Sequence, residues 1–229
     1  MRYFLVLLVI ILIYLIYALI PSLWFKVMYK IKRKENDKII YLTFDDGPSS
    51  KYTNKLLDVL KKYNIKASFF CVASYALENK DIIKRMKREG HVIGLHSLKH
   101  ENAYLMDIFK TNKDFKNSLK IMKDLGLNIK YFRPPWGDLN LVSLFNLKKY
   151  NLKLILWHVM AEDWKKDTTA FDIEIKLLRR IKGGDIICLH DGRGKNNAPL
   201  KTIEALDKAI PILLGKSFVF ETVDKYNEK

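Results

Sequence analysis

The sequence contains few of the residues that staple small secreted proteins or that repeat in fibrous ones. It has two cysteines, six prolines and ten glycines in 229 residues, which excludes a disulfide framework, a collagen-like repeat and a Pro/Gly-rich low-complexity chain. Acidic residues are also scarce, since 25 Asp and Glu stand against 41 Lys and Arg, a net charge of +16. Hydrophobic residues make up 49% of the chain, so it is not a disordered protein. We expect a globular protein with a basic surface.

The basic excess would suit a nucleic acid, an anionic membrane or an anionic cell-wall polymer. The lysines are scattered along amphipathic segments, and no basic stretch alternates with aromatic residues that could stack on bases. We therefore interpret most of the excess as solvated helix faces and expect no nucleic-acid partner. Attraction to anionic wall polymers remains compatible with this interpretation.

A long apolar run stands near the amino terminus. Residues 3–20 carry no charge and no glycine, and at about 1.5 Å per residue they nearly span the roughly 30 Å hydrocarbon core of a bilayer. A cleaved signal peptide is the alternative, but the run is long for one, and Ala18-Leu19-Ile20 is not a small-x-small cleavage site. We predict an uncleaved membrane anchor at residues 1–25, a basic and polar linker at residues 26–38, and one domain at residues 39–229.

The orientation of this anchor is ambiguous. Only Arg2 precedes the apolar run, whereas five basic residues follow it: Lys26, Lys30, Lys32, Arg33 and Lys34. The positive-inside rule, taken alone, would place the domain in the cytoplasm.

After residue 38 the chain alternates between short apolar blocks and amphipathic stretches. Seven blocks have the continuous apolar character of strands buried on both faces: residues 39–44, 67–72, 91–95, 130–133, 152–157, 185–189 and 217–220. The stretches between them predict helices over residues 51–63, 81–89, 114–125, 139–150, 168–181 and 199–214. This alternation predicts one α/β domain with parallel strands, either a barrel or a doubly wound sheet.

Polar residues follow five of the predicted strands, and in either architecture functional groups collect at these carboxyl ends. The segments are TFDDGP at 43–48, HSLKH at 96–100, RPPWG at 133–137, DW at 163–164 and LHD at 189–191. Buried apolar strands do not need such endings for stability. We therefore take these segments as the candidate functional site.

Two histidines and an aspartate in these segments predict a metal site. The adjacent carboxylates of Asp45 and Asp46 are sensible if a cation lies beside one and the other stays available as a base. His96 and His100 are spaced i, i+4, so their imidazoles would share a face if the segment were helical. Two histidines and one carboxylate form a facial triad that leaves metal positions open. We predict Asp46, His96 and His100 as the ligands.

Taken in order, the five motifs resemble those of NodB-type polysaccharide deacetylases, carbohydrate esterase family 4. The resemblance covers residues 38–222 and implies a distorted (β/α) barrel of about seven parallel strands. It implies a metal-dependent hydrolase that removes N-acetyl groups from aminosugars of a cell-surface polysaccharide, peptidoglycan or a chitin-like polymer. The implied metal is typically zinc, with cobalt, nickel or manganese as alternatives. It also implies a membrane-anchored domain outside the cell, in conflict with the positive-inside count.

The resemblance assigns roles to single residues. Asp45 would be the general base, and His190 the general acid that protonates the departing amine. Arg133 would orient Asp45, and Asp163 would orient His190. The backbone N–H of Trp136 would stabilise the oxyanion. The residues expected to contact the substrate are Pro134, Trp136, Trp164, Cys188 and Leu189.

Two positions depart from the family pattern. Met160 stands where an aspartate is usual, and Cys188 stands two residues before His190, where leucine is usual. Both changes put the acyl group and the substrate in doubt more than the metal chemistry. We predict Cys71 and Cys188 to be buried free thiols, because their strands are unlikely neighbours.

Two other functions remain open at this point. One is deacylation or deformylation of a lipid-linked aminosugar at the membrane, which the short linker and the ambiguous topology favour. The other is a catalytically inactive glycan-binding protein, which the presence of a base, an acid and three ligands disfavours.

Overall fold

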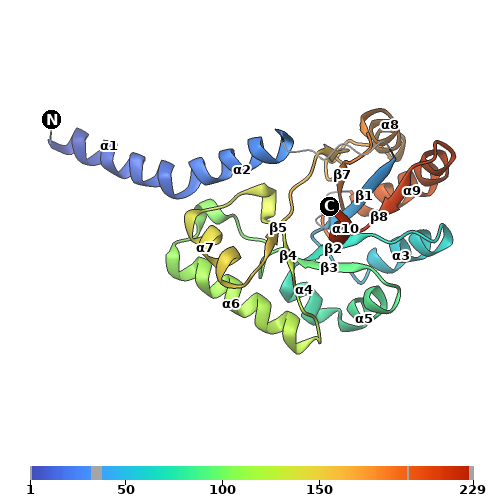
Figure 1. The fold of residues 1–229 in the computed structure, drawn as a ribbon, viewed down its shortest axis with the longest axis horizontal. Helices are drawn as coiled ribbons and strands as arrows, with labels where there is room; N and C mark the ends of the chain where they lie inside the picture. Colours follow the sequence, from blue (N-terminus) through green and yellow to red (C-terminus); the bar gives the residue numbers. More distant parts are fainter. Residues whose placement is uncertain (1, 32–37, 195, 227–229) are drawn as a thin grey trace.

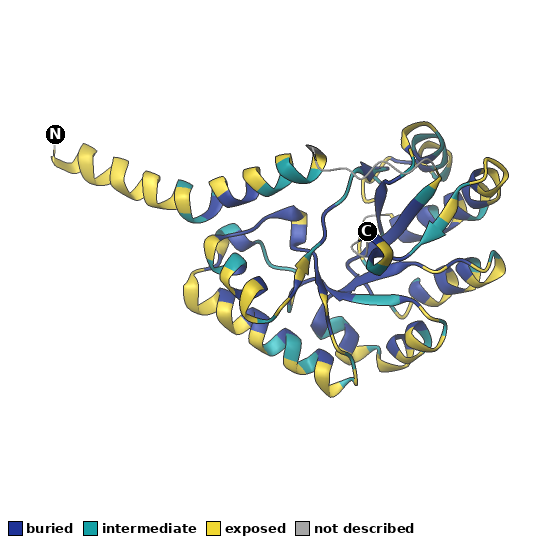
Figure 2. Cartoon of the chain, in the orientation of Figure 1, coloured by how far each residue is buried: buried dark blue, intermediate teal, exposed yellow. Residues whose placement is uncertain are grey.

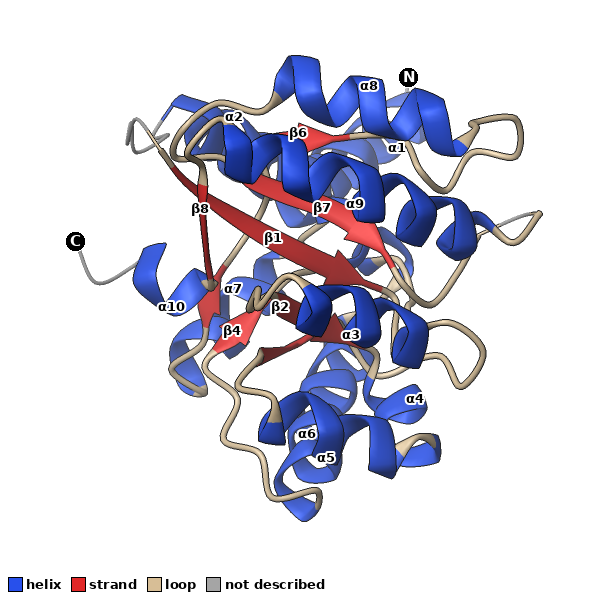
Figure 3. Ribbon diagram, turned by 90° about the vertical axis from the view of Figure 1, so that its right-hand side faces the viewer, coloured by secondary structure: helices blue, strands red, loops and turns tan. Residues whose placement is uncertain are grey.

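The domain is built on one parallel sheet that curves into an open barrel (Figures 1 and 3). The computed structural model describes residues 2–31, 38–194 and 196–226. The strand order is β5-β4-β3-β2-β1-β7-β6, and β8 pairs with the first half of β1. The predicted distorted barrel of about seven parallel strands is thereby confirmed. The strands are Ile39–Asp45 (β1), Ser68–Cys71 (β2), Val92–Leu95 (β3), Tyr131–Phe132 (β4), Lys153–Leu154 (β5), Val159–Met160 (β6), Ile186–His190 (β7) and Val219–Glu221 (β8).

Strand β1 lies at the centre of the sheet and carries the first candidate residues. Its side chains alternate between two environments, as the twofold period of a strand requires. Ile40, Leu42 and Phe44 pack in the core beneath the helices, whereas Tyr41 belongs to a smaller cluster inside the barrel. In register, Asp45 at the end of β1 is paired with His190 at the end of β7. The two residues predicted as base and acid therefore stand side by side.

The helices cover the sheet with one buried face and one exposed face (Figure 2). In α6, for example, Thr111, Phe115, Ser118 and Met122 are buried at helical spacing. The helices of the domain are Thr53–Lys62 (α3), Ala73–Glu78 (α4), Lys80–Arg88 (α5), Ile108–Asp124 (α6), Leu141–Lys149 (α7), Ala170–Arg180 (α8), Ala198–Gly215 (α9) and Val223–Tyr226 (α10), with 3₁₀ turns at Ala103–Leu105 (η2) and Pro135–Gly137 (η3).

The structure differs from the sequence-based expectation in five elements. Helix α6 begins six residues earlier than predicted, because the Asp107 side chain caps it by accepting from the Lys110 N–H at 2.7 Å. The predicted strand 152–157 shrinks to β5, since the carbonyls of Ile155 and Leu156 accept hydrogen bonds from a buried arginine side chain. Strand β6 and the short helices α4 and α10 were not predicted.

One apolar helix runs from Arg2 to Lys30. It is long and apolar enough to cross a membrane, and a signal sequence near the amino terminus can have the same length and composition. It comprises Arg2–Tyr14 (α1), a π-helical turn at Leu15–Leu19 (η1) and Ile20–Ile31 (α2). Helix α1 projects from the domain with its side chains exposed (Figures 1 and 2). The helix thus continues into the predicted linker, of which residues 32–37 lie outside the described residues. The division into anchor, linker and domain stays a prediction.

The second half of this helix is docked on the domain. The Ser22 hydroxyl donates to the Leu139 carbonyl at 2.8 Å and accepts from the Leu139 N–H at 2.6 Å. Lys26 forms an ion pair with Asp138 at 2.6 Å, and the Tyr17 hydroxyl donates to the Met106 carbonyl at 2.9 Å. These contacts hold the helix against the loop that follows β4 and against the segment between η2 and α6.

We expect Ser22→Ala to destabilise the whole chain, because it leaves the buried Leu139 N–H and carbonyl without their partner. An unsatisfied buried polar group costs about 1–3 kcal/mol. The measurement is denaturant unfolding in detergent micelles, with Ser50→Ala, at an exposed turn position, as the control. Equal stability of the two variants would contradict the proposed stabilising contact.

Candidate active site

The residues predicted as metal ligands meet at the carboxyl ends of β1 and β3. The Oδ1 atom of Asp46 lies 3.2 Å from Nε2 of His96 and 2.9 Å from Nε2 of His100. One ligand atom from each of the three residues lies within 4.8 Å of the others. The arrangement is compact enough for one ion to contact all three side chains.

The backbone that brings the two histidines together is a turn, so the expected helical segment is wrong. Ser97 and His100 have left-handed φ values of 68° and 58°, which a helix cannot contain. The Ser97 hydroxyl accepts from the His100 N–H at 2.9 Å. The buried carboxylate of Asp114, on α6, accepts from the Leu98 N–H at 2.9 Å. The i, i+4 spacing identified His96 and His100, but a tight turn rather than a helix brings their side chains together.

The donor set fits a divalent cation. His96 Nδ1 lies 2.6 Å from the Arg133 carbonyl oxygen, which can only accept, so this nitrogen carries the proton. The Nε2 lone pair of a neutral His96 then faces a carboxylate oxygen, an arrangement that a cation between them stabilises. Two imidazoles and one carboxylate are ligands suited to zinc and similar metals.

Asp45 is held by a fully buried arginine. Arg133 Nη1 donates to Asp45 Oδ1 and to the Thr43 hydroxyl, both at 2.7 Å. The remaining guanidinium nitrogens donate to the carbonyls of Ile155 and Leu156 at 3.1 and 3.0 Å. The guanidinium also lies 4.1 Å above the Phe70 ring. Arg133 therefore fixes the position of the Asp45 carboxylate.

His190 is held by a second buried carboxylate. Its Nδ1 lies 2.9 Å from Asp163 Oδ1, and its backbone N–H donates to Asp163 Oδ2 at 2.8 Å. The Thr202 hydroxyl donates to the same Oδ2 at 3.0 Å. Burial opposes a charged imidazole, but the Asp163 carboxylate outweighs it and raises the pKa of His190 to about 9. His190 is thus held as an acid at neutral pH.

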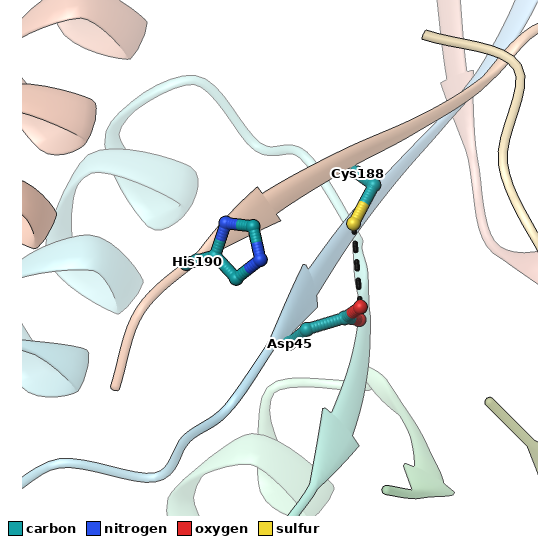
Figure 4. Close-up of side chains that lie close together, drawn as sticks. All are labelled: Asp45, Cys188 and His190. Carbon is teal, nitrogen blue, oxygen red and sulfur yellow. Dashed lines mark hydrogen bonds between the residues drawn. The ribbon is translucent and has the colours of Figure 1, made fainter. Parts of the chain in front are cut away.

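Cys188 lies between these groups and points at Asp45 (Figure 4). Its thiol donates to Asp45 Oδ2 at 3.3 Å. One ligand atom each from Asp45, Cys188 and His190 also lies within 4.8 Å of the others. However, burial raises the pKa of the Cys188 thiol well above its usual range, and Asp45 is already paired with Arg133. This trio therefore holds a protonated thiol and an ion-paired carboxylate, which suits hydrogen bonding better than metal ligation.

A cavity of about 330 Å³ connects the metal-ligand candidates with the base and acid. Trp136 and Trp164 form its rim, and their rings pack edge-on against His100 and His190 at centroid distances of 4.4 and 5.3 Å. The same two tryptophans, with Arg193 and Gly194, also line an adjoining groove of about 1040 Å³. The cavity therefore adjoins a larger groove with which it shares Trp136 and Trp164.

Two of the predicted substrate contacts lie elsewhere. Leu189 is fully buried in the main core, because successive residues of β7 point to opposite faces. Pro134 is buried and lines a separate internal space of about 20 Å³. Three residues that the sequence analysis did not assign to the site line the cavity instead: Trp157, Arg193 and Gly194. Met160, identified above as a departure from the family pattern, lines it as well.

Asp114 and Asp191 also support the site and were missed. Asp114 stands on the buried face of α6, and this polar residue in an apolar stripe was the signal that could have identified it. Burial raises the pKa of Asp191 to about 7, although the Thr53 hydroxyl, which donates to it at 2.5 Å, acts in the opposite direction. Its carboxylate packs directly against Gly47, where a Cβ atom would meet it at 2.3 Å. Asp191 thus supports the loop that carries Asp46.

Five side chains in the loops of the site sit on left-handed backbone: Asp46, Ser97, His100, Trp136 and Glu162. In residues other than glycine this conformation costs free energy, and it persists only where the surroundings enforce it. At Trp136, with φ 56° and ψ 8°, it directs a large ring out of a buried loop. Such strained positions cluster at functional sites.

Comparison with known proteins agrees with this geometry. The sequence profile of the family described as polysaccharide deacetylase matches residues 32–155, more than half of the chain. The chain belongs to the polysaccharide deacetylase family. This confirms the predicted family and the predicted class of enzyme, a hydrolase of polysaccharide-linked amides.

Individual relatives extend the match over most of this deacetylase. It is 33% identical over 192 residues to a peptidoglycan-N-acetylglucosamine deacetylase of Bacillus cereus, covering 83% of this chain and 88% of the relative. A crystal structure of a peptidoglycan N-acetylglucosamine deacetylase with a bound N-hydroxybenzamide superposes with a TM-score of 0.79 at 32% identity, covering 84% and 89% of the two chains. A family 4 acetyl xylan esterase of Clostridium thermocellum, solved with a cobalt ion, gives 0.74 at 34% identity, covering 82% and 90%.

We expect Gly192→Ala to distort the deacetylase site. A Cβ atom at this position would lie 1.9 Å from the Asp46 carbonyl oxygen and 2.7 Å from the Gly47 nitrogen, so the loop carrying Asp46 must move. Overpacking of this kind typically costs about 1–3 kcal/mol. The measurement is thermal unfolding together with bound metal.

Gly215→Ala is the control for this experiment, because a Cβ at the end of α9 meets nothing within 4 Å. We expect Gly215→Ala to leave both the thermal unfolding temperature and the amount of bound metal unchanged. Retention of wild-type stability and metal by Gly192→Ala would contradict the tight contact between the two loops.

Proposed function

We propose that this deacetylase removes N-acetyl groups from aminosugars of a cell-surface glycan, with peptidoglycan as the first candidate. The observation that carries the proposal is the placement of three groups around one cavity: the Asp46–His96–His100 set, the Asp45–Arg133 pair and the His190–Asp163 pair. Amide hydrolysis requires a base for the water and an acid for the nitrogen, and these pairs supply both. The similarity to a peptidoglycan-N-acetylglucosamine deacetylase supports this choice of glycan.

A divalent metal, with zinc as the first candidate, would be held by Asp46, His96 and His100, and when bound it would polarise the carbonyl and lower the pKa of a water. The cobalt ion bound to the esterase of similar fold supports a transition metal in this family. His96 is suited to this role because its other nitrogen donates to the Arg133 carbonyl. That hydrogen bond orients the ring and leaves Nε2 as the ligand atom.

Asp45 and His190 would carry the proton transfers. As water attacks the acetyl carbon, Asp45 takes its proton, and Arg133 keeps the carboxylate aligned for that transfer. The imidazolium of His190 then protonates the nitrogen as the C–N bond breaks, so that a neutral amine leaves with acetate as the other product. The backbone N–H of Trp136 would stabilise the oxyanion that forms between these two proton transfers.

The substrate would lie across the rim of the cavity. Trp136 and Trp164 are 54% and 37% exposed, which leaves ring faces free for stacking on sugars, and the adjoining groove would receive the neighbouring residues of the polymer. Cys188 reaches into the acyl end of the cavity and would contact the acetyl methyl beside Asp45. The relatives described above do not support the lipid-linked alternative.

We also propose that the amino-terminal helix anchors the enzyme with the domain outside the cell. The support is the length and apolar character of the helix and the position of the proposed polymer beyond the membrane. The basic residues after the helix count against this orientation. Anionic wall polymers would be attracted by the basic surface in the same compartment.

The decisive test separates the two adjacent aspartates. Asp45→Asn should keep the metal and lose about 10²–10⁴-fold in turnover, because the amide cannot accept a proton. Asp46→Asn should bind metal more weakly, since a neutral group replaces an anionic ligand. Added metal should therefore restore activity to Asp46→Asn but not to Asp45→Asn. The measurements are bound metal by elemental analysis and acetate release from purified peptidoglycan over a series of zinc concentrations.

Asp124→Asn, at an exposed ion pair on α6, is the matched control and should behave as the wild type. Equal rescue of both site variants, or full activity in either, would refute the proposed division of roles. Release of acetate from chitin-like polymers but not from peptidoglycan would keep the mechanism and change the substrate.

The pH dependence of catalysis should depend on Asp163. Because His190 acts in its protonated form, activity should fall as pH rises through its raised pKa. Asp163→Asn removes the charge that raises this pKa, so the alkaline limb of the kcat/KM profile should move to lower pH. Asp124→Asn should leave the limb in place. An unchanged limb in Asp163→Asn would show that another group controls it.

A further inference from the structure

Exposed apolar side chains gather where the amino-terminal helix leaves the domain. Phe109 is 84% exposed, Leu105 is 82% exposed and Phe145 is 66% exposed, although large apolar groups of this kind are normally at least half buried. They come from η2, the start of α6 and α7, and the π-helical turn η1 contacts both η2 and α7. With two neighbours they form a set that we call the collar: Leu105, Ile108, Phe109, Leu141 and Phe145.

The outer side of the docked helix continues this apolar surface. Ile20, Leu23 and Trp24 are 56%, 59% and 63% exposed, even though the opposite side of the same helix packs on the domain through Ser22. A helix docked on a protein in water would normally present polar residues on its outer side. An apolar outer side next to an apolar collar indicates a surface that is not in contact with water.

The length of the free helix points to the same conclusion. The first hydrogen bond between helix and domain is made by Tyr17, so only residues 3–16 are both apolar and clear of the domain. Fourteen residues span about 21 Å, whereas a bilayer core measures about 30 Å. If the helix crosses the core while it stays docked, roughly 9 Å of membrane must be filled by the docked segment and its surroundings. Interfacial helices insert their apolar faces by about 5–10 Å.

We propose that the collar and the outer side of α2 are inserted in the lipid surface, so that the domain is seated in the membrane by this face. The occupant is a bilayer, and the acyl chains at its interface cover Phe109 and Phe145. Lys113, one turn after Phe109 on α6 and exposed, is placed to reach the headgroups. In Figure 2, exposed surface on α7 and on the start of α6 lies beneath the projecting α1. The proposal rests on the membrane anchor and does not depend on the deacetylase activity.

The test uses the full chain in vesicles of phosphatidylcholine and phosphatidylglycerol. A nitroxide label is attached in Phe109→Cys, and in Phe171→Cys as the control, because Phe171 is 64% exposed on α8, outside the collar. The native Cys71 and Cys188 are each 1% exposed and do not compete for the label. Accessibility of each label to oxygen, which concentrates in lipid, is compared with accessibility to a water-soluble nickel complex.

The expected result is a reversal between the two positions: the label at 109 is reached better by oxygen, and the label at 171 better by the nickel complex. Equal behaviour of the two labels would overturn the proposal. Protection of position 109 from both reagents would also overturn it and would indicate that a second copy of the chain covers the collar. Release of the chain by alkaline carbonate would refute the anchor itself, while acetate release, measured in parallel, tests the proposed function separately.

Discussion

The buried ion pair between Arg133 and Asp45 connects the proposed base with the proposed metal site. The Arg133 guanidinium joins the end of β1 to the segment after β5. The backbone carbonyl oxygen of Arg133 orients His96. Removing one partner of such a pair leaves an uncompensated charge and costs about 3–5 kcal/mol. The proposed base and one of the proposed metal ligands, His96, are therefore held by one residue. A substitution of Arg133 would disturb both the base and the metal site. The separate contributions of these two groups are therefore best resolved by substituting Asp45 and Asp46.

The parts of the site that lie at strand ends could be predicted from the sequence. Parallel strands place their carboxyl ends at one edge, so Asp46 and His190 had to be near each other if both blocks were strands. The contributions of Asp114 and Arg193 could not be predicted in this way, because each depends on how a helix or loop approaches the edge. The HSLKH segment identified the histidines through a helical spacing that the folded chain does not use. There, left-handed backbone at Ser97 overrides the local pattern.

The lengths of the elements were also set by tertiary contacts. The apolar run at 152–157 has the composition of a strand, yet two of its carbonyls bind the Arg133 side chain and leave the ladder. An apolar run shows that a segment is buried, but the partner of its backbone decides whether it is a strand. The same reasoning explains α2: its residues have the character of an anchor, and Ser22 and Lys26 nevertheless bind the domain.

The contact between α2 and residues 138–139 has a consequence for where this enzyme can work. The loop that presents Trp136 is bound directly to the helix, so this contact would couple the proposed catalytic site directly to the proposed anchor. An enzyme on a long tether samples a volume set by the length of its linker. With the anchor proposed above, the cleft would instead sweep a thin layer at a constant height above the lipid, and its encounters would depend on diffusion in the plane of the membrane. Glycan that lies within this layer would be processed, and strands farther out would escape.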